Sequence, residues 1–258
     1  MTDPSSGSVR LPQSLEHARI PNLPPSAFYM ADFISEEEEK LILEKIERAP
    51  KARWRQLTHR RLQTWPSDLV RGDTLLDTTP LPDWLKDPVI PRLLSIPVSS
   101  DSDTEAQSSS HIFAASPHKQ PNHVLINEYP PETGIMPHKD GGAYHPVVCT
   151  VSLGSSLCLN LYKAKEDGGI DPDPVWRILQ EPRSLLITTQ DLYTEYLHGI
   201  EPIAVDADLS EETVANWSLL RSPSDFAEGK NSRETRISLT YRDVLKVSKL
   251  GGLLNRRP

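Results

Sequence analysis

The chain has 258 residues, with 37% hydrophobic residues, 25% charged residues and a net charge of −8. This length suffices for one large domain whose core needs no disulfide staples, and the composition excludes a disordered chain. The acidic balance excludes a general attraction to anionic lipid or nucleic acid, so any polyanion must be met by a local patch.

No run of residues approaches the roughly 20 consecutive apolar positions that a membrane-spanning helix requires, so no membrane association is expected. The polar first ten residues contain no signal-peptide core, and secretion is not expected either. Cys149 and Cys158 lie in apolar runs, which favours buried free thiols in a reducing compartment over a disulfide. We expect a protein of the cytoplasm and nucleus, with a monomer as the default state.

The amino-terminal part is predicted to be a tail followed by a helical extension. Residues 1–24 are rich in Pro and Ser without periodicity, which predicts a mobile tail. Residues 25–97 are predicted to form a helical and lid extension that packs on the core. Within it, Ser35 and Glu38 have the spacing of a capping box, and apolar residues then recur at helical spacing, so a helix is predicted over residues 36–48.

A basic segment lies inside this extension, between residues 51 and 72. Its local balance is +5, from the cations Lys51, Arg53, Arg55, Arg60, Arg61 and Arg71 against Asp68 alone. Trp54 and Trp65 interleave with these cations. Cations for phosphates beside aromatic rings for bases are typical of a grip on single-stranded or flipped nucleotides. A solvated basic face with two core tryptophans is an equally good interpretation.

The remaining chain divides into an insertion and a β-rich core. Residues 98–122 are Ser-rich and acidic, which predicts a flexible surface insertion that contributes nothing to the core. From residue 123 to 258 short alternating runs predict strands at 123–129, 147–153, 157–162, 184–188 and 235–242. The polar stretches 163–182 and 204–232 are predicted to be loops. The expected fold is therefore β-rich α+β, with an antiparallel jelly-roll core and flanking N-terminal helices.

Candidate metal ligands follow the first of these strands. His138 and Asp140 are two residues apart, and on extended backbone such positions face the same way. An imidazole and a carboxylate can then bind one cation, and a third ligand from a distant strand completes the facial triad of non-heme iron sites. His198, after the strand at 184–188, is the candidate. The alternatives are a surface loop for the pair and a structural histidine for His198.

The strand at 235–242 supplies the context for these ligands. Alternation places Arg236, Ser238, Thr240 and Arg242 on one face and Ile237, Leu239 and Tyr241 on the other. If the polar face looks into a barrel, buried guanidinium groups need anions, and a dicarboxylate cosubstrate supplies one. The alternative is an edge strand with a solvated face. Asn127 and Tyr129 likewise share a face of their strand and can hydrogen-bond a carboxylate or keto group.

Together, Asn-x-Tyr, a His-x-Asp nine residues after that Tyr, a distal His and Arg-x5-Arg resemble the AlkB family, most closely its sixth human-type branch, over about residues 24–254. The resemblance implies a double-stranded β-helix. It implies iron(II) at His138, Asp140 and His198, and 2-oxoglutarate at Asn127, Tyr129, Arg236, Ser238 and Arg242. Arg236 would pair with the distal carboxylate of 2-oxoglutarate and Arg242 would lie nearer the metal. Ser238 stands where some relatives have Asn.

The resemblance further implies a dioxygenase that uses iron(II), 2-oxoglutarate and O2. The leading expectation is oxidative demethylation of alkylated DNA or RNA, in which a hydroxylated N-methyl group is lost as formaldehyde. Candidate substrate contacts are Tyr144 and His145, which closely follow Asp140, and Arg60, Arg61 and Trp65 of the basic segment. Hydroxylation or demethylation of a protein or small molecule by the same site is an alternative, and a non-catalytic nucleic-acid-binding module is a third.

Overall fold

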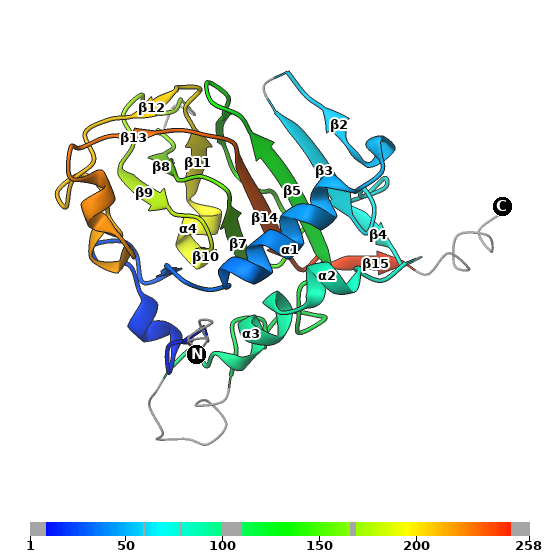
Figure 1. Cartoon of the computed structure of the whole chain (residues 1–258). Coiled ribbons are helices and arrows are strands. Elements are labelled where there is room, and N and C mark those ends of the chain that lie inside the picture. The colour runs from blue at the N-terminus through cyan, green and yellow to red at the C-terminus, as the bar shows by residue number, and fades with distance from the viewer. Residues whose placement is uncertain (1–8, 59, 78, 100–109, 166–168, 249–258) are drawn as a thin grey trace, which may run out of the picture.

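The computed structural model describes residues 9–58, 60–77, 79–99, 110–165 and 169–248. Most of its strands belong to two antiparallel sheets (Figure 1). The larger sheet contains β1 (Ala27–Met30), β2 (Arg55–Gln56), β3 (Arg61–Trp65), β5 (His123–Tyr129), β7 (Val147–Leu153), β10 (Leu185–Thr189) and β14 (Arg236–Arg242). The smaller sheet contains β6 (Ile135–His138), β8 (Leu157–Lys163), β9 (Trp176–Gln180) and β11 (Tyr196–Ile200).

The order of the larger sheet is β1-β10-β7-β14-β5-β3-β2 and that of the smaller sheet is β6-β11-β8-β9. Two short pairs complete the strands: β12 (Val205–Asp206) with β13 (Asn231–Ser232), and the parallel β4 (Thr74–Leu76) with β15 (Lys246–Ser248). Helical segments are α1 (Glu36–Glu47), α2 (Asp83–Lys86), α3 (Val89–Ser95), α4 (Gln190–Thr194), η1 (Leu15–Ala18), η2 (Lys51–Arg53), η3 (Trp217–Leu219) and η4 (Pro223–Phe226). Non-consecutive neighbours in both sheets give the predicted jelly roll.

The predicted helix and strands are confirmed. β5 and β7 have the predicted bounds, β8 and β14 differ from theirs by one residue at one end, and β10 is shifted by one residue at both ends. α1 begins with the predicted capping box, because the Glu38 backbone N–H donates to Ser35 Oγ while the Ser35 N–H donates to the Glu38 carboxylate. Two otherwise unpaired N–H groups are satisfied in this way.

The three N-terminal helices cover one face of the larger sheet (Figure 1). Ile42 and Ile46 of α1 and Leu85 of α2 join a core with apolar side chains of β5, β7 and β14. Tyr241 of β14 lies in this core and its hydroxyl donates to the Leu85 carbonyl oxygen at 2.8 Å. The alternation of β14 is thereby confirmed on its apolar side, and its polar side faces the smaller sheet.

Residues 9–24 are not part of a mobile tail. Leu15 and Ala18 of η1 are buried, and Ile20 is fully buried with its N–H donating to the Ala27 carbonyl oxygen at 3.0 Å. These buried side chains do not recur at a regular spacing along the sequence. The hydrophobic pattern therefore gave no indication that this segment packs on the core. Residues 1–8 of the predicted tail lie outside the described residues.

The predicted surface insertion contributes to the core after all. Its first part, residues 100–109, lies outside the described residues. In its second part, Phe113 is fully buried in the core beneath the helices, and His118 Nδ1 lies 2.7 Å from the carboxylate of the buried Asp243. The whole insertion was predicted to lie on the surface because its composition is Ser-rich, and this composition gave no indication that its second part packs on the core.

The two predicted loops are also structured. Residues 163–182 contain β9, which pairs with β8. Residues 204–232 contain β12, β13 and two short helices, and Leu209, Val214 and Leu220 are buried in the core beside the smaller sheet. Asn216 anchors this segment, because its side-chain amide exchanges two hydrogen bonds with the backbone of Leu179. Because proline and polar residues surround these buried apolar residues in the sequence, the segment was predicted to be a loop.

Cys149 and Cys158 are free thiols and both are buried, as predicted. Burial raises the pKa of both, that of Cys158 to about 12. Among the described residues, no helix has the length and apolar character needed to cross a membrane.

Candidate active site

The three candidate metal ligands converge on one point. His138 ends β6 and lies directly opposite His198 of the neighbouring strand β11, with the two ring centroids 4.4 Å apart. Asp140 follows β6 by two residues. One ligand atom from each side chain lies within 4.8 Å of the other two, so a single ion can contact all three.

Two glycines allow this approach of β6 and β11. A Cβ atom on Gly199 would lie 3.0 Å from the Pro137 nitrogen and 3.2 Å from the Ile135 carbonyl oxygen, and one on Gly134 would collide with the Ile200 carbonyl oxygen. Pro137 is tolerated within β6 because β6 is an edge strand and one side of its backbone forms no ladder. The glycine beside His198 therefore sets the distance between the two imidazoles.

Hydrogen bonds and burial prepare the ligands for a cation. His138 Nδ1 donates to the Met136 carbonyl oxygen at 2.9 Å, which leaves Nε2 available for a metal. Burial lowers the pKa of His198, which favours the neutral ring that a metal ligand must have. Asp140 Oδ1 accepts from Arg242 Nη1 at 2.6 Å, which holds the carboxylate in one orientation.

The loop that carries Asp140 is tied to α4 on both sides. Lys139 Nζ donates to the Thr194 carbonyl oxygen, and the Tyr193 hydroxyl donates to the Gly141 carbonyl oxygen, each at 2.5 Å. These bonds flank Asp140 directly. The carboxylate is thus positioned from α4 as well as by Arg242.

A cavity of about 120 Å³ lies beside the three ligands, between the two sheets. Its lining includes every residue that the resemblance assigned to 2-oxoglutarate: Asn127, Tyr129, Arg236, Ser238 and Arg242. Strand register explains this convergence, because Tyr129 lies opposite Arg236 and Asn127 lies opposite Ser238. Aliphatic side chains of both sheets form most of the remaining wall.

Arg236 is a buried cation that lacks a carboxylate partner among the described residues. Its side chain is 2% exposed, and its Nη2 donates to Ser152 Oγ and to Gln180 Oε1, both at 2.9 Å. Its Nε has no hydrogen-bond partner. Burial lowers its pKa to about 10, so the guanidinium is still charged at pH 7. A buried cation without a carboxylate partner favours the binding of an anion.

Arg242 has one carboxylate and one aromatic neighbour. It pairs with Asp140, and its guanidinium carbon lies 4.0 Å from the centre of the Tyr144 ring. Its buried Nε has no hydrogen-bond partner in the part of the chain that the structure describes. Arg236 and Arg242 thus bring two positive charges to the cavity wall, against the single carboxylate of Asp140 among the residues that line it. The electrostatics fit a bound small acid.

The five candidate substrate residues separate into three groups. Arg60 lines the cavity, and its Nε donates to Asn127 Oδ1 at 3.1 Å. Tyr144 and His145 do not line the cavity: Tyr144 stacks on Arg242, and the His145 N–H donates to the Asp243 carbonyl oxygen at 2.8 Å. They flank the end of β14.

Arg61 and Trp65, the two remaining candidate substrate contacts, lie on the opposite face of the sheet from the cavity and do not line it. Both face the same way on β3, and Arg61 forms two bonds to Glu128 at 2.6 and 2.7 Å. Trp65 packs edge-on against Trp84 of α2 with ring centroids 5.7 Å apart. Alternation along β3 explains the outcome, because Leu62 and Thr64 take the cavity-facing positions.

Sequence reasoning missed two polar residues that hold Arg236. Ser152 belongs to the predicted strand at 147–153, where it alternates with apolar neighbours and was not singled out. Gln180 belongs to β9, a strand that had been predicted as a loop. The sequence does contain a signal for this strand, because residues 176–180 can alternate between two faces. Trp176, Ile178 and Gln180 share one of them.

Comparisons with known proteins agree with this geometry. A family model described as the 2OG-Fe(II) oxygenase superfamily matches residues 26–242. The chain is 37% identical to "Probable RNA/DNA demethylase ALKBH6" of Danio rerio over 94% of this chain and 96% of that protein. It is 26% identical to "tRNA (carboxymethyluridine(34)-5-O)-methyltransferase alkbh8" of Xenopus tropicalis over 87% of this chain but 32% of that protein.

Among solved structures, "The structure of OsALKBH1" superimposes with a TM-score of 0.51 at 15% identity, over 86% of this chain and 98% of that chain, which shows a shared fold. The superfamily uses iron(II), 2-oxoglutarate and O2, and the two imidazoles and one carboxylate found here are a donor set suited to that iron. The chain belongs to the 2OG-Fe(II) oxygenase superfamily and, within it, to the AlkB family of dioxygenases.

Proposed function

We propose that the chain catalyses oxidative demethylation of an alkylated nucleic acid. The observation that carries this proposal is a single cavity in which a metal-ligand triad lies beside a buried, uncompensated arginine. The relative from Danio rerio is named a probable RNA/DNA demethylase, and 96% of its length is covered. The substrate class proposed here follows from that likeness together with the local charge described below.

In this proposal His138, Asp140 and His198 hold iron(II), and Arg236 pairs with the distal carboxylate of 2-oxoglutarate. A guanidinium group binds a carboxylate through two parallel hydrogen bonds, and Arg236 Nε has no other partner among the described residues. Arg242 contributes a second cation nearer the metal. Its hydrogen bond to Asp140 keeps that ligand oriented.

Asn127, Tyr129 and Ser238 supply neutral hydrogen bonds to the same cosubstrate. Asn127 Oδ1 accepts from Arg60, which directs the amide nitrogen of Asn127 away from Arg60 and leaves its N–H groups as donors for a carboxylate or keto oxygen. Burial raises the pKa of Tyr129, so its phenol is protonated and can donate. Ser238 is shorter than the Asn of some relatives and supplies one hydroxyl in its place.

Bound iron(II), with 2-oxoglutarate and O2, supplies the oxidation that hydroxylates a methyl carbon of the substrate. The residues of this chain fix the ligands, neutralise the cosubstrate and keep water out. Leu159, Leu161 and Leu186 line the cavity from both sheets and form its apolar wall. Exclusion of water strengthens the interactions of Arg236 and Arg242 with a bound anion.

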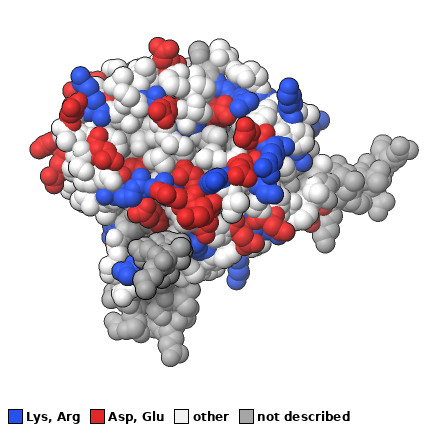
Figure 2. Space-filling view, viewed as in Figure 1, with Lys and Arg blue, Asp and Glu red and all other residues white. Residues whose placement is uncertain are grey.

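Arg60 offers the contact for the nucleic acid. It lines both the cavity and an outer hollow of about 380 Å³, whose other lining residues are Gln56, Thr58, Arg61, Glu128, Pro130 and Thr133. On the face in Figure 2, acidic and basic side chains are intermixed, so no broad basic surface attracts a polyanion there. A phosphate beside the cavity therefore depends on a few local cations. Tyr144 and His145 are proposed as additional contacts at the mouth.

The oxygenase part of the proposal is tested without a nucleic acid. Anaerobic addition of iron(II) and 2-oxoglutarate should give a visible charge-transfer band, and His138→Ala should abolish it. Arg61→Ala is the matched control, since Arg61 lies on the other face of the sheet, and it should leave the band unchanged. A colourless wild-type protein contradicts the proposed metal and cosubstrate site.

The substrate is tested by product analysis. Formaldehyde release from methylated DNA and RNA oligonucleotides should be compared with succinate formation on protein extract. Turnover on oligonucleotides supports the proposal, and the preferred strand identifies DNA or RNA. Turnover confined to the protein extract contradicts the nucleic-acid part and leaves a protein hydroxylase or demethylase. The protein is expected to act as a monomer in the cytoplasm and nucleus.

A further inference from the structure

The hydrogen-bond partners of Arg236 are neutral, and this distinguishes Arg236 from Arg233, a buried arginine nearby. Arg233, three residues earlier, is 7% exposed and its Nη2 and Nε donate to the carboxylate of Asp206 at 2.6 and 3.0 Å. Arg236 is 2% exposed, and it donates to a hydroxyl and an amide oxygen instead. Only the first of these charges is neutralised by the fold.

Gln180 is placed to hold Arg236 from the smaller sheet. It ends β9, is 1% exposed and lines the cavity. Its Oε1 accepts from Arg236 Nη2 at 2.9 Å and lies 3.3 Å from Ser152 Oγ, which also accepts from Arg236 at 2.9 Å. Gln180 and Ser152, from opposite sheets, thus fix one end of the guanidinium group.

The amide of Gln180 provides an acceptor without a charge. A glutamate of the same length at this position would pair with Arg236 inside the protein, as Asp206 pairs with Arg233. A carboxylate there would compete with any ligand carboxylate for the same cation. With glutamine the guanidinium is oriented while its charge stays available.

We propose that Gln180 is a positioning residue for cosubstrate binding: it fixes the guanidinium of Arg236 and, being neutral, reserves the charge of Arg236 for the distal carboxylate of 2-oxoglutarate. This inference rests on the proposed role of Arg236 as the cosubstrate anchor. Gln180 acts through Arg236 and accounts for a preference for a diacid over a 2-oxo monoacid.

The test compares two ligands on the full chain. Affinities of 2-oxoglutarate and of pyruvate, a 2-oxo acid without a distal carboxylate, are measured anaerobically with manganese(II) in the metal site. Gln180→Glu should weaken 2-oxoglutarate binding about 100-fold, because the new carboxylate occupies Arg236, and should leave pyruvate binding within about twofold. The unfolding midpoint in urea without ligand should be unchanged or higher, because a buried ion pair is added.

Gln63→Glu is the matched control. Gln63 is a fully buried glutamine of β3 that faces the helices, where its side chain bonds to Ile46 and Trp65. A buried carboxylate there should lower the unfolding midpoint and leave both ligand affinities unchanged. If Gln180→Glu does not fold, Gln180→Met serves instead, and 2-oxoglutarate binding should weaken about fivefold with pyruvate binding unchanged.

Three results separate the inference from the proposed function. Unchanged 2-oxoglutarate binding in the Gln180 variant overturns the inference. Equal weakening of both ligands also overturns it, because such a change reflects general damage to the cavity. A wild-type protein that binds the two ligands equally well contradicts the anchoring role of Arg236 itself, and with it the proposed cosubstrate site.

Discussion

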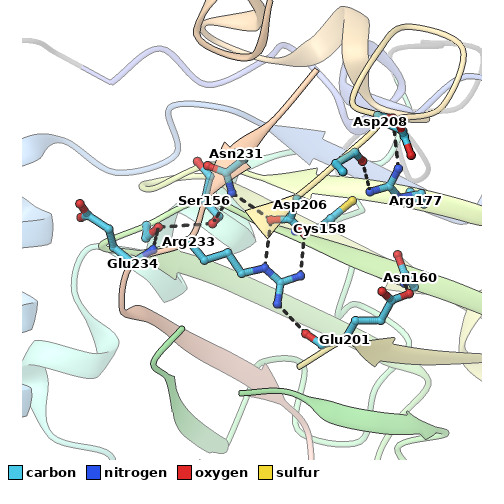
Figure 3. Close-up of polar contacts among 12 residues, drawn as sticks. Ser156, Cys158, Asn160, Arg177, Glu201, Asp206, Asp208, Asn231, Arg233 and Glu234 are labelled. Carbon is cyan, nitrogen blue, oxygen red and sulfur yellow. Dashed lines mark hydrogen bonds and ion pairs between the residues drawn. The ribbon is translucent and has the colours of Figure 1, made fainter. Parts of the chain in front are cut away.

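Two buried arginines, Arg233 and Arg236, lie three residues apart and have opposite surroundings. Figure 3 shows Arg233 between Asp206 and Glu201, with its donors directed at the carboxylate of the first and the backbone carbonyl oxygen of the second. Asn231 donates to the same Asp206 carboxylate at 2.9 Å, and the Cys158 N–H donates at 3.3 Å. This cluster is complete without a ligand.

Arg236 lies in the cavity with neutral acceptors and an unsatisfied Nε. Burying a cation without an anion costs free energy. The fold avoids this cost at Arg233 by pairing it with Asp206, and it bears the cost at Arg236. Burial alone therefore does not mark a functional arginine, whereas a missing counter-charge does. The following variants test that distinction.

The largest effect is expected at the compensated arginine. Asp206→Ala leaves the Arg233 charge buried without its partner, so the free energy of unfolding should fall by about 3–5 kcal/mol. Urea denaturation measures this loss. The double variant Asp206→Leu with Arg233→Met should recover most of it, since neither charge remains. A single variant as stable as the wild type would show that Arg233 finds another partner.

Low pH should lower the free energy of unfolding mainly through His123, which lies on the cavity side of β5. Burial lowers the pKa of His123, beside Arg242, to about 4, below the value of about 6.5 in the unfolded chain. The unfolded state therefore takes up a proton that the folded state resists. Stability from this group is fully present above pH 6.5 and is lost as the pH falls toward 4, by roughly 3 kcal/mol. His123→Asn should flatten the dependence of unfolding free energy on pH in that window.

Arg236→Met should change stability and binding in opposite directions. Removal of the uncompensated cation should raise the unfolding free energy of the ligand-free protein by about 1–2 kcal/mol. In the wild type, 2-oxoglutarate at 100 times its Kd should add about 2.7 kcal/mol, and in the variant this addition should disappear. Thermal unfolding with and without 2-oxoglutarate measures both. A destabilised variant would mean that Arg236 serves the fold.

The smallest effects distinguish the neighbours Arg60 and Arg61. Arg61→Ala breaks a pair with Glu128 at a half-exposed position, which should cost at most about 1 kcal/mol. Because Arg61 lines only the outer hollow and is paired with Glu128, its loss should weaken oligonucleotide binding less than the loss of Arg60. Arg60→Ala should weaken oligonucleotide binding and reduce its salt dependence by about one phosphate contact. Fluorescence anisotropy across a salt series measures both. Equal effects on oligonucleotide binding would contradict the role proposed for Arg60, which lines the cavity as well as the outer hollow.

The metal triad and the alternation of β14 could be predicted from the sequence because they depend on local spacing. His138 and Asp140 are two residues apart, and Arg236 and Arg242 fall on one face of a single strand. The distal ligand His198 was a candidate from its place after the strand at 184–188, and the family resemblance strengthened it. No local spacing indicated its pairing with His138, because that pairing joins strands 60 residues apart.

Other features depended on contacts that no local pattern records. The face of β3 that meets the cavity is set by its register with β5, so the sequence alone did not show that Arg61 and Trp65 lie away from the cavity. Gln180 was missed because β9 is a short edge strand surrounded by proline and polar residues. Its importance lies in a hydrogen bond to Arg236, 56 residues later in the chain.

The enclosure of Cys149 and Cys158 has a consequence for an enzyme that handles O2 at a reduced metal. Stray oxidants attack the thiolate form of cysteine, and burial with a raised pKa keeps both thiols protonated and out of reach. Met136, two residues before His138, is 82% exposed and presents its thioether instead. Oxidative self-damage should therefore appear as a methionine sulfoxide, a lesion that cellular reductases repair, before it reaches either cysteine.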